Sequence, residues 1–141
     1  MKKELELKLV AKYPNLFRGY GGDMRQTCMH WGFSHREGWY SIIDYIGEQL
    51  VKLGVEDKVI ADQVKEKFGS LRFYYHTQGL AEIEKEKVSL IIDTAEEESY
   101  KTCEDCGIKE NVSMRGNSWV TTLCSNCWEK ILKEKNNDSN G

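Results

Sequence analysis

Apolar side chains recur at helical spacing in three stretches of the chain. The clearest lies over residues 39–53, where apolar residues return every three or four positions and Gly54 provides a stop signal. Weaker patterns predict a helix over residues 3–13, which Pro14 should end, and another over residues 80–100. The outer faces of this last helix are acidic, which is typical of a helix surface in contact with water. We expect these helices to supply most of the core.

Between the second and third helices, apolar and polar residues alternate in a pattern that predicts a β-hairpin. Gly69-Ser70 fits a two-residue turn with glycine first, which would place Phe68 opposite Leu71. Residues 56–67 also contain helix formers at helical spacing, so strand and helix both stay open there, with the hairpin favoured. In the hairpin, the inward face would carry Val64, Phe68, Leu71, Phe73 and Tyr75.

The opposite face of this hairpin combines basic and aromatic side chains. Besides Gln63, it would carry the candidate ligand-binding or partner-binding residues Lys65, Lys67, Arg72, Tyr74 and His76. Cations interleaved with an aromatic ring suit a phosphate-bearing ligand or single-stranded nucleic acid, through charge and stacking. A strand face turned to water is also commonly charged, so a solvated surface is the simpler interpretation.

A glycine-rich stretch over residues 18–38 shows no sustained period and predicts a long loop. Such loops are uncommon in compact domains unless they are functional or held by their own aromatic side chains. Cys28 and two histidines in this loop are compatible with a second metal site or with a nucleophile and its base. Packing or surface roles are more frequent for residues scattered in this way. The candidates retained from the loop are Asp23, Arg25, His30 and His35.

The strongest chemical signal is a pair of Cys-x-x-Cys motifs, Cys103/Cys106 and Cys124/Cys127. Their separation matches a four-thiolate zinc site, because each pair can form one edge of a tetrahedron. Residues 111–122 predict a second hairpin, and a helix over 128–135 would direct its N-terminus at the thiolates. Knuckle, hairpin and helix follow the order of a treble-clef or zinc-ribbon-like module. Since four thiolates close the metal shell, we predict one structural Zn²⁺ per chain.

Composition limits the possible classes of protein. The net charge is −3 and no part of the chain is strongly basic, which argues against bulk electrostatic capture of nucleic acid. Without an apolar run long enough for a bilayer or a signal peptide, we expect a soluble cytoplasmic protein. Five cysteines, four at metal spacing, fit a reducing compartment better than two disulfides.

These patterns predict an α+β fold in three parts. In the body, residues 1–101, helices would pack on a small antiparallel hairpin. The four-cysteine module would span residues 102–135, and a polar, disordered tail would span residues 136–141.

Several of these motifs occur together in a fixed order along the chain. The chain has Gly38-Trp39, then Val-Lys-Glu-Lys-Phe-Gly-Ser-Leu-Arg-Phe-Tyr-Tyr over 64–75, then the two cysteine motifs. With these motifs, residues 13–128 resemble small uncharacterised proteins encoded by bacteriophages and prophages. The resemblance carries no established activity or catalytic residues. It implies a phage accessory protein in a bacterial cytoplasm, a context that includes host-takeover and counter-defence proteins such as anti-CRISPRs.

Three functions follow as hypotheses. The first is a non-enzymatic, zinc-stabilised protein that binds a bacterial host protein. The second is recognition of nucleic acid or a nucleotide by the basic and aromatic hairpin face. The third is a small metal-dependent nuclease that uses His30, His35 or His76, and it is the weakest because no compact acid, base and metal constellation is evident.

Overall fold

The computed structural model describes residues 1–22 and 27–140, with the backbone alone at residues 31 and 137–140. The fold is α+β, as the sequence predicts. The described residues form four α-helices, α1 (Lys3–Lys12), α2 (Tyr40–Leu53), α3 (Glu82–Ser99) and α4 (Ser125–Asn140). A three-stranded sheet has the order β1 (Phe33–Ser34), β2 (Val59–Lys67), β3 (Ser70–Thr77), and a separate antiparallel pair joins β4 (Val112–Arg115) to β5 (Thr121–Cys124). Short 3-10 helices cover Cys28–Trp31, Glu37–Trp39 and Glu56–Lys58.

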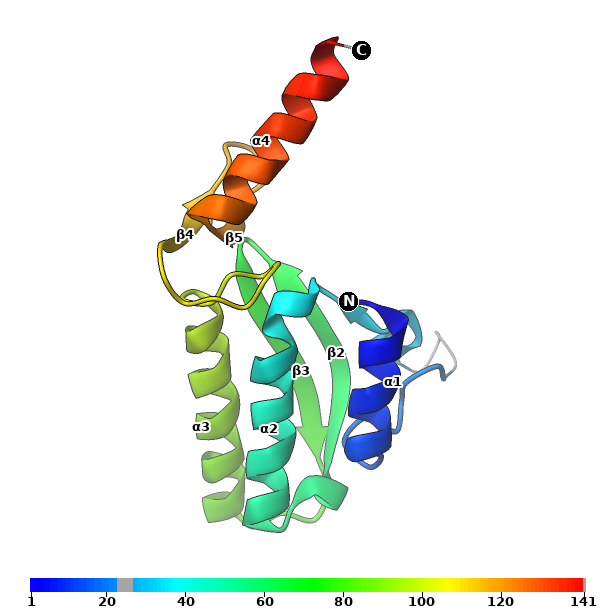
Figure 1. Ribbon diagram of the computed structural model, residues 1–141. Helices are drawn as coiled ribbons and strands as arrows, with labels where there is room; N and C mark the ends of the chain where they lie inside the picture. Colours follow the sequence, from blue (N-terminus) through cyan, green and yellow to red (C-terminus); the bar gives the residue numbers. More distant parts are fainter. Residues whose placement is uncertain (23–26, 141) are drawn as a thin grey trace.

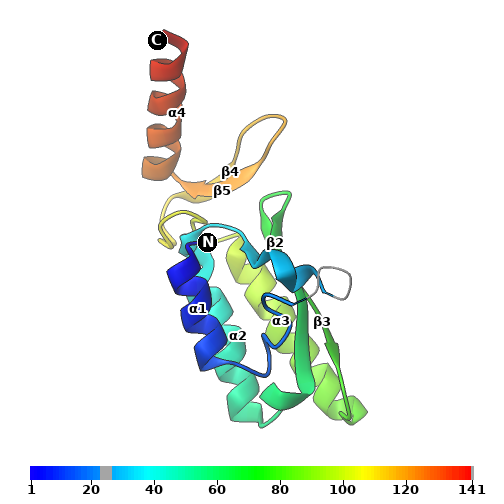
Figure 2. The same cartoon turned by 90° about the vertical axis from the view of Figure 1, so that its right-hand side faces the viewer.

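The body is built around α2 and α3, which run side by side along the β2–β3 hairpin (Figures 1 and 2). The apolar face of α2 is buried, as its spacing predicts, and Gly54 ends the helix in the left-handed conformation. Trp39, Ile43, Ile46 and Leu50 lie fully inside this core. Burial of a side chain of this size contributes about 1.5–3 kcal/mol, so α2 organises the body.

The β2–β3 hairpin is confirmed, but its turn lies one residue earlier than the sequence predicts. Lys67 pairs with Ser70, so Phe68 and Gly69 form the turn, with φ values of 53° and 84°. Both angles are positive, as in a type I′ turn. The predicted register would have placed Glu66 opposite Phe73, whereas the observed one pairs Val64 with Phe73 inside the core. Core packing therefore overrides the preference for glycine at the first turn position.

This shift corrects two predictions about the hairpin faces. Phe68 does not point inward, because the turn leaves its side chain 75% exposed. Arg72 lies opposite Lys65 rather than Lys67, and Tyr74 lies opposite Gln63. A single-residue slip changes every cross-strand pair, although the alternation of inward and outward residues along β3 is as predicted.

Strand β3 is at the edge of the sheet, and α3 supplies acceptors for its outward amides. The Leu71 N–H donates to Ser99 Oγ at 2.9 Å, and the Phe73 N–H donates to Glu96 Oε2 at 2.9 Å. Unpaired amides at a sheet edge can pair with another chain. The helix thus both packs on the hairpin and covers part of its edge.

Two segments differ from the predicted secondary structure. The glycine-rich stretch contains a two-residue strand, β1, which pairs in parallel with β2 at Val64 and Lys65. Helix α4 begins at Ser125 and continues to Asn140, so helix occupies most of the stretch predicted as a disordered tail. Within the described residues, no helix is both long and apolar enough to cross a membrane.

Candidate metal centre

The first cysteine pair is held by a tight turn of backbone hydrogen bonds. The Cys103 N–H donates to Ile108 O at 2.8 Å, and the Gly107 N–H donates to Cys103 O at 2.9 Å. The Cys106 N–H points at Cys103 Sγ, 3.5 Å away. Gly107 adopts a φ of 83°, which glycine reaches without strain. This geometry is a knuckle that presents both thiols on one side.

The second pair lies where β5 runs into α4. Cys124 is the last residue of β5, and Cys127 lies in the first turn of the helix. The Cys127 N–H points at Cys124 Sγ, again 3.5 Å away. The positive end of the helix dipole faces these sulfurs and favours their negative charge. Knuckle, hairpin and helix N-terminus are therefore arranged as in a treble-clef module.

The two pairs meet as one cluster that can hold a metal ion. The four Sγ atoms lie within 4.8 Å of one another, and Cys106 Sγ lies 3.8 Å from Cys124 Sγ. A tetrahedral zinc site with Zn–S bonds of about 2.3 Å has S–S edges of about 3.8 Å. A disulfide would bring two sulfurs to about 2.05 Å, so the cluster has the dimensions of a metal site.

The electrostatics of the cluster also favour a cation. Burial raises the pKa of the Cys106 thiol, and burial together with the neighbouring sulfurs raises the pKa of Cys127. Burial opposes ionisation of Cys124 too, but the Cys127 N–H and the other thiols outweigh it and lower the pKa of Cys124 to about 7. The four sulfurs would therefore not all ionise side by side unless a bound cation compensated their charge.

The knuckle is docked on the start of α2 through close backbone contacts. The Gly38 N–H donates to Glu104 O at 2.7 Å, and Trp39 Nε1 donates to Thr102 O at 3.0 Å. A Cβ atom on Gly38 would lie 2.1 Å from Cys103 O. The Arg36 N–H donates to Glu104 Oε2 at 3.1 Å. The sequence shows the Gly-Trp pair but gives no sign that it receives the metal module.

Of the candidates from the glycine-rich loop, the described residues His30 and His35 belong to no cluster of metal-ligating side chains in the part of the chain that the structure describes. Asp23 and Arg25 lie outside the described residues. Cys28 is exposed, and His30 Nδ1 lies 2.6 Å from Gly22 O. His35 is buried against Phe33 and Trp39, and burial lowers its pKa to about 4.

The histidines invoked for a nuclease are separated along the sheet. His76 lies opposite Ile60, whereas His35 directly follows the pairing of Ser34 with Lys65. About five rows of 3.3 Å along the strands and two strand spacings of about 4.8 Å across the sheet put the two histidines roughly 20 Å from each other. His76 instead contacts Asp62, with Nδ1 at 2.9 Å from Oδ1.

The outer face of the hairpin is less basic than the sequence predicts. Lys65 Nζ lies 5.9 Å from the Tyr74 ring centre, and Lys67, Tyr74 and His76 are exposed. Arg72, however, lines a hollow with Asp93, Glu96 and Glu97 of α3, and its Nε atom is buried. Acidic side chains therefore accompany both Arg72 and His76.

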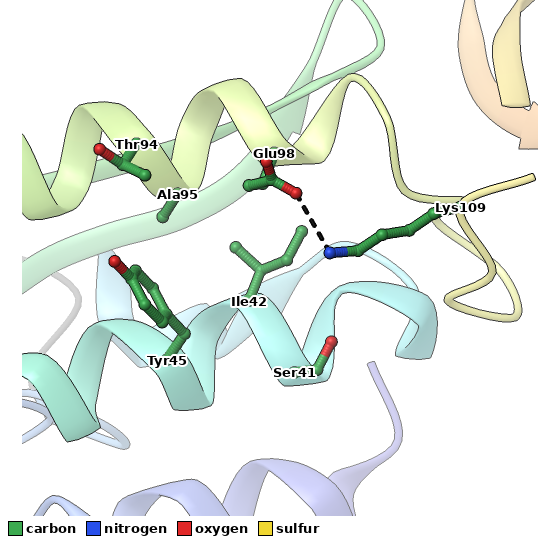
Figure 3. A pocket seen from close by; sticks show the side chains of 7 residues that line it. All are labelled: Ser41, Ile42, Tyr45, Thr94, Ala95, Glu98 and Lys109. Carbon is green, nitrogen blue, oxygen red and sulfur yellow. Dashed lines mark hydrogen bonds and ion pairs between the residues drawn. The ribbon is translucent and has the colours of Figure 1, made fainter.

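A shallow hollow of about 450 Å³ lies between α2 and α3 (Figure 3). Ile42, Tyr45 and Ala95 form its apolar walls, and Lys109 reaches Glu98 across its rim at 3.2 Å. The Thr94 hydroxyl donates to Leu90 O within its own helix. The charged pair at the rim and the Thr94 hydroxyl are therefore already engaged within the protein.

Comparison with protein-family models, curated proteins and solved structures finds no match to this chain. The resemblance to phage-encoded proteins therefore gains no support from these comparisons. The cysteine cluster is the feature of the chain with the clearest chemistry.

Proposed function

We propose that the chain is a non-enzymatic binding protein whose four-cysteine module holds one structural Zn²⁺. The observation that carries the metal assignment is the approach of the four thiols, with the 3.8 Å edge between Cys106 and Cys124. Four thiolates around a tetrahedral ion leave no coordination position for water or substrate. The metal would therefore stabilise residues 102–135 and their contact with the body.

The metal assignment is tested by elemental analysis of reduced protein. We expect about one zinc per chain, and Cys106→Ser should lower both the zinc content and the thermal stability. Cys28→Ser, at the exposed cysteine outside the cluster, is the matched control and should change neither. Zinc-free protein of unchanged stability would contradict the proposal.

The proposed partner is a bacterial host protein, and the proposed context is a phage accessory protein of the host cytoplasm. Counter-defence, as with anti-CRISPR proteins, is the activity that this context favours. The support is the resemblance of the motifs together with a rigid α+β body that a closed metal site braces. A binding role needs such a rigid surface and no catalytic group.

Affinity capture from bacterial lysate, with and without nuclease, tests the partner class. We expect a protein to be captured at equal yield in both conditions. Capture that disappears after nuclease treatment would instead favour the nucleic-acid function.

That second function has one specific observation in its favour, the stacking of Lys65 over Tyr74 on the outer hairpin face. The acidic neighbours of Arg72 and His76 weigh against it, because they reduce attraction for phosphate. Lys65→Glu and Lys67→Glu together test it. Unchanged partner binding in that variant would exclude the outer hairpin face as the binding surface.

A further inference from the structure

Phe68 has a backbone and a side chain that folding alone does not explain. It occupies the first position of the β2–β3 turn at a φ of 53°, and its ring is 75% exposed. Asparagine or glycine is favoured at this turn position, and a bulky side chain at positive φ is an outlier. Strained residues cluster at functional sites, so the outlier indicates a role outside folding.

Trp119, in the connection between β4 and β5, is 76% exposed and lies beside Phe68. The two residues line one hollow of about 290 Å³, together with Lys67 and Val120. Ser118 and Trp119 also line a second hollow, of about 560 Å³, that extends to α4. Because the two hollows share Ser118 and Trp119, they adjoin each other, and we name the pair of hollows the junction groove.

The junction groove is held in shape by contacts between the tips of the two hairpins. Thr122 Oγ1 donates to Gly69 O, which ties β5 to the β2–β3 turn. The Val120 and Met114 side chains lie within 3.5 and 3.6 Å of the position that a Cβ on Gly69 would take. The turn of β2–β3 accordingly reaches the β4–β5 pair (Figure 2). A preformed groove loses less entropy when a partner binds.

The charges along the junction groove are mainly positive. Its lining includes Lys67 and Arg36, together with Lys135, which already has an interaction within the chain, whereas Glu66 is the acidic residue. Glu66 Oε1 accepts the Gly69 N–H at 2.9 Å, so it is engaged within the turn. Lys67 Nζ lies 5.6 Å from the Phe68 ring centre, which puts a cation directly beside the exposed aromatic surface. The positive charge of the groove lining is complementary to carboxylates on a partner.

We infer that the junction groove binds a protein partner through an apolar segment flanked by acidic side chains, an inference that rests on the proposed function. Exposed Trp and Phe rings are typical of interface anchors, and the adjacent Lys67 and Arg36 would face acidic side chains at the rim. The aliphatic walls from Val120 and Leu132 suit apolar side chains better than nucleotide bases. The groove spans the body and the four-cysteine module, so an intact metal site would be needed to form it.

Two variants separate binding from folding. Phe68→Asn relieves the turn strain, so the urea midpoint should stay the same or rise. Trp119→Ala removes an exposed ring and should leave that midpoint within error. Leu90→Ala, which removes a 68% exposed side chain from α3, is the matched control.

The test selects short random peptides from a displayed library against the full, metal-loaded chain. We expect the selected peptides to combine Asp or Glu with apolar residues. Their affinity should fall at least tenfold, by about 1.4 kcal/mol or more, in Trp119→Ala and in Phe68→Asn, and stay unchanged in Leu90→Ala. Selected peptides without acidic residues, or affinities unchanged in both groove variants, would overturn the inference.

The same variants would also show whether the junction groove binds a different class of molecule. Binding of single-stranded oligothymidine that Trp119→Ala abolishes would assign the groove to nucleic acid and overturn the inference. Self-association in sedimentation that the same variant abolishes would assign it to a second copy. If Trp119→Ala still captures the same host protein as the wild type, the groove inference fails while the proposed function stands. If the wild type captures no protein, the proposed function itself fails.

Discussion

At the scale of single residues, Gly38 determines how closely the knuckle can approach α2. A Cβ there would lie 2.1 Å from Cys103 O and 2.5 Å from the Glu104 carbonyl carbon, both backbone atoms that cannot rotate away. We expect Gly38→Ala to lower the free energy of unfolding by at least about 2 kcal/mol, measured by urea denaturation of metal-loaded protein.

Gly54→Ala is the control for this prediction, since a Cβ there meets open space and only the positive φ is unfavourable. Its expected cost is about 1 kcal/mol. Equal losses in the two variants would mean that the close approach at Gly38 has no special energetic weight.

A second prediction at this scale concerns His35 and pH. Burial is the main cause that lowers its pKa to about 4; the Arg36 carbonyl and Glu37 oppose the shift, and the Met1 ammonium adds to it. The unfolded chain, with a pKa near 6.5, binds a proton that the folded protein excludes. The contribution of neutral His35 to the free energy of unfolding is therefore complete above about pH 6.5. It is lost as the pH falls towards 4, by about 3 kcal/mol in total.

Comparison of the wild type with His35→Phe isolates this effect from the carboxylates that titrate in the same range. The variant keeps an aromatic ring between Phe33 and Trp39 but cannot be protonated. We expect its free energy of unfolding to depend less steeply on pH between 6.5 and 4. Parallel pH profiles for the two proteins would contradict the assignment.

At the scale of secondary-structure elements, the edge of β3 depends on side chains of α3. Ser99 is fully buried, and its hydroxyl is the acceptor for the Leu71 N–H. Ser99→Ala leaves that buried donor unpaired, so we expect a loss of about 1–3 kcal/mol in unfolding free energy. Thr94→Ala, on the same helix with a hydroxyl bonded only to Leu90 O, should change it by less than about 0.5 kcal/mol.

The elements themselves were largely predictable from local pattern. The spacing of apolar residues predicts α1, α2 and α3, and the cysteine spacing predicts the knuckle, whereas α4 begins at Ser125, three residues before the predicted helix over 128–135. The sequence predicts the β2–β3 turn one residue late because Gly69 suits the first turn position, whereas pairing of Val64 with Phe73 determines the register. Strand β1 was missed because two residues leave no visible alternation.

At the scale of the whole molecule, metal removal should have a regional effect. The contacts of the four-cysteine module with the body converge on residues 36–39 and on the β2–β3 turn. After chelation, we expect amide hydrogen exchange to accelerate in residues 102–135 and 36–39, while the core of α2 stays protected. Readdition of Zn²⁺ should restore protection.

Exchange that rises equally through α2 and β2 would mean that the body cannot fold without the metal. Protection that is unchanged by chelation would mean that the metal has no structural role. The measurement thus distinguishes a local brace from a global requirement and from no requirement.

The contacts between distant segments were beyond the reach of the sequence. Gly38 lies in a glycine-rich loop, and nothing in its neighbours indicates a partner more than sixty residues away. The same holds for Phe68 and Trp119, since the sequence shows two aromatic residues but not their meeting in one groove. Arg72 was expected to face a phosphate, and only the packing of α3 reveals its acidic neighbours.

The docking of the knuckle on Gly38 and Trp39 also limits how this protein can be recombined. A four-cysteine module is commonly regarded as a cassette that can be exchanged between proteins at its flanking sequence. Here a crossover at residue 102 would separate the Thr102 and Glu104 carbonyls from their donors, the Trp39 indole N–H and the Gly38 backbone N–H. The structural unit that has to be transferred as a whole is discontinuous, since it consists of residues 36–39 together with 102–135. Grafting experiments should therefore move both segments.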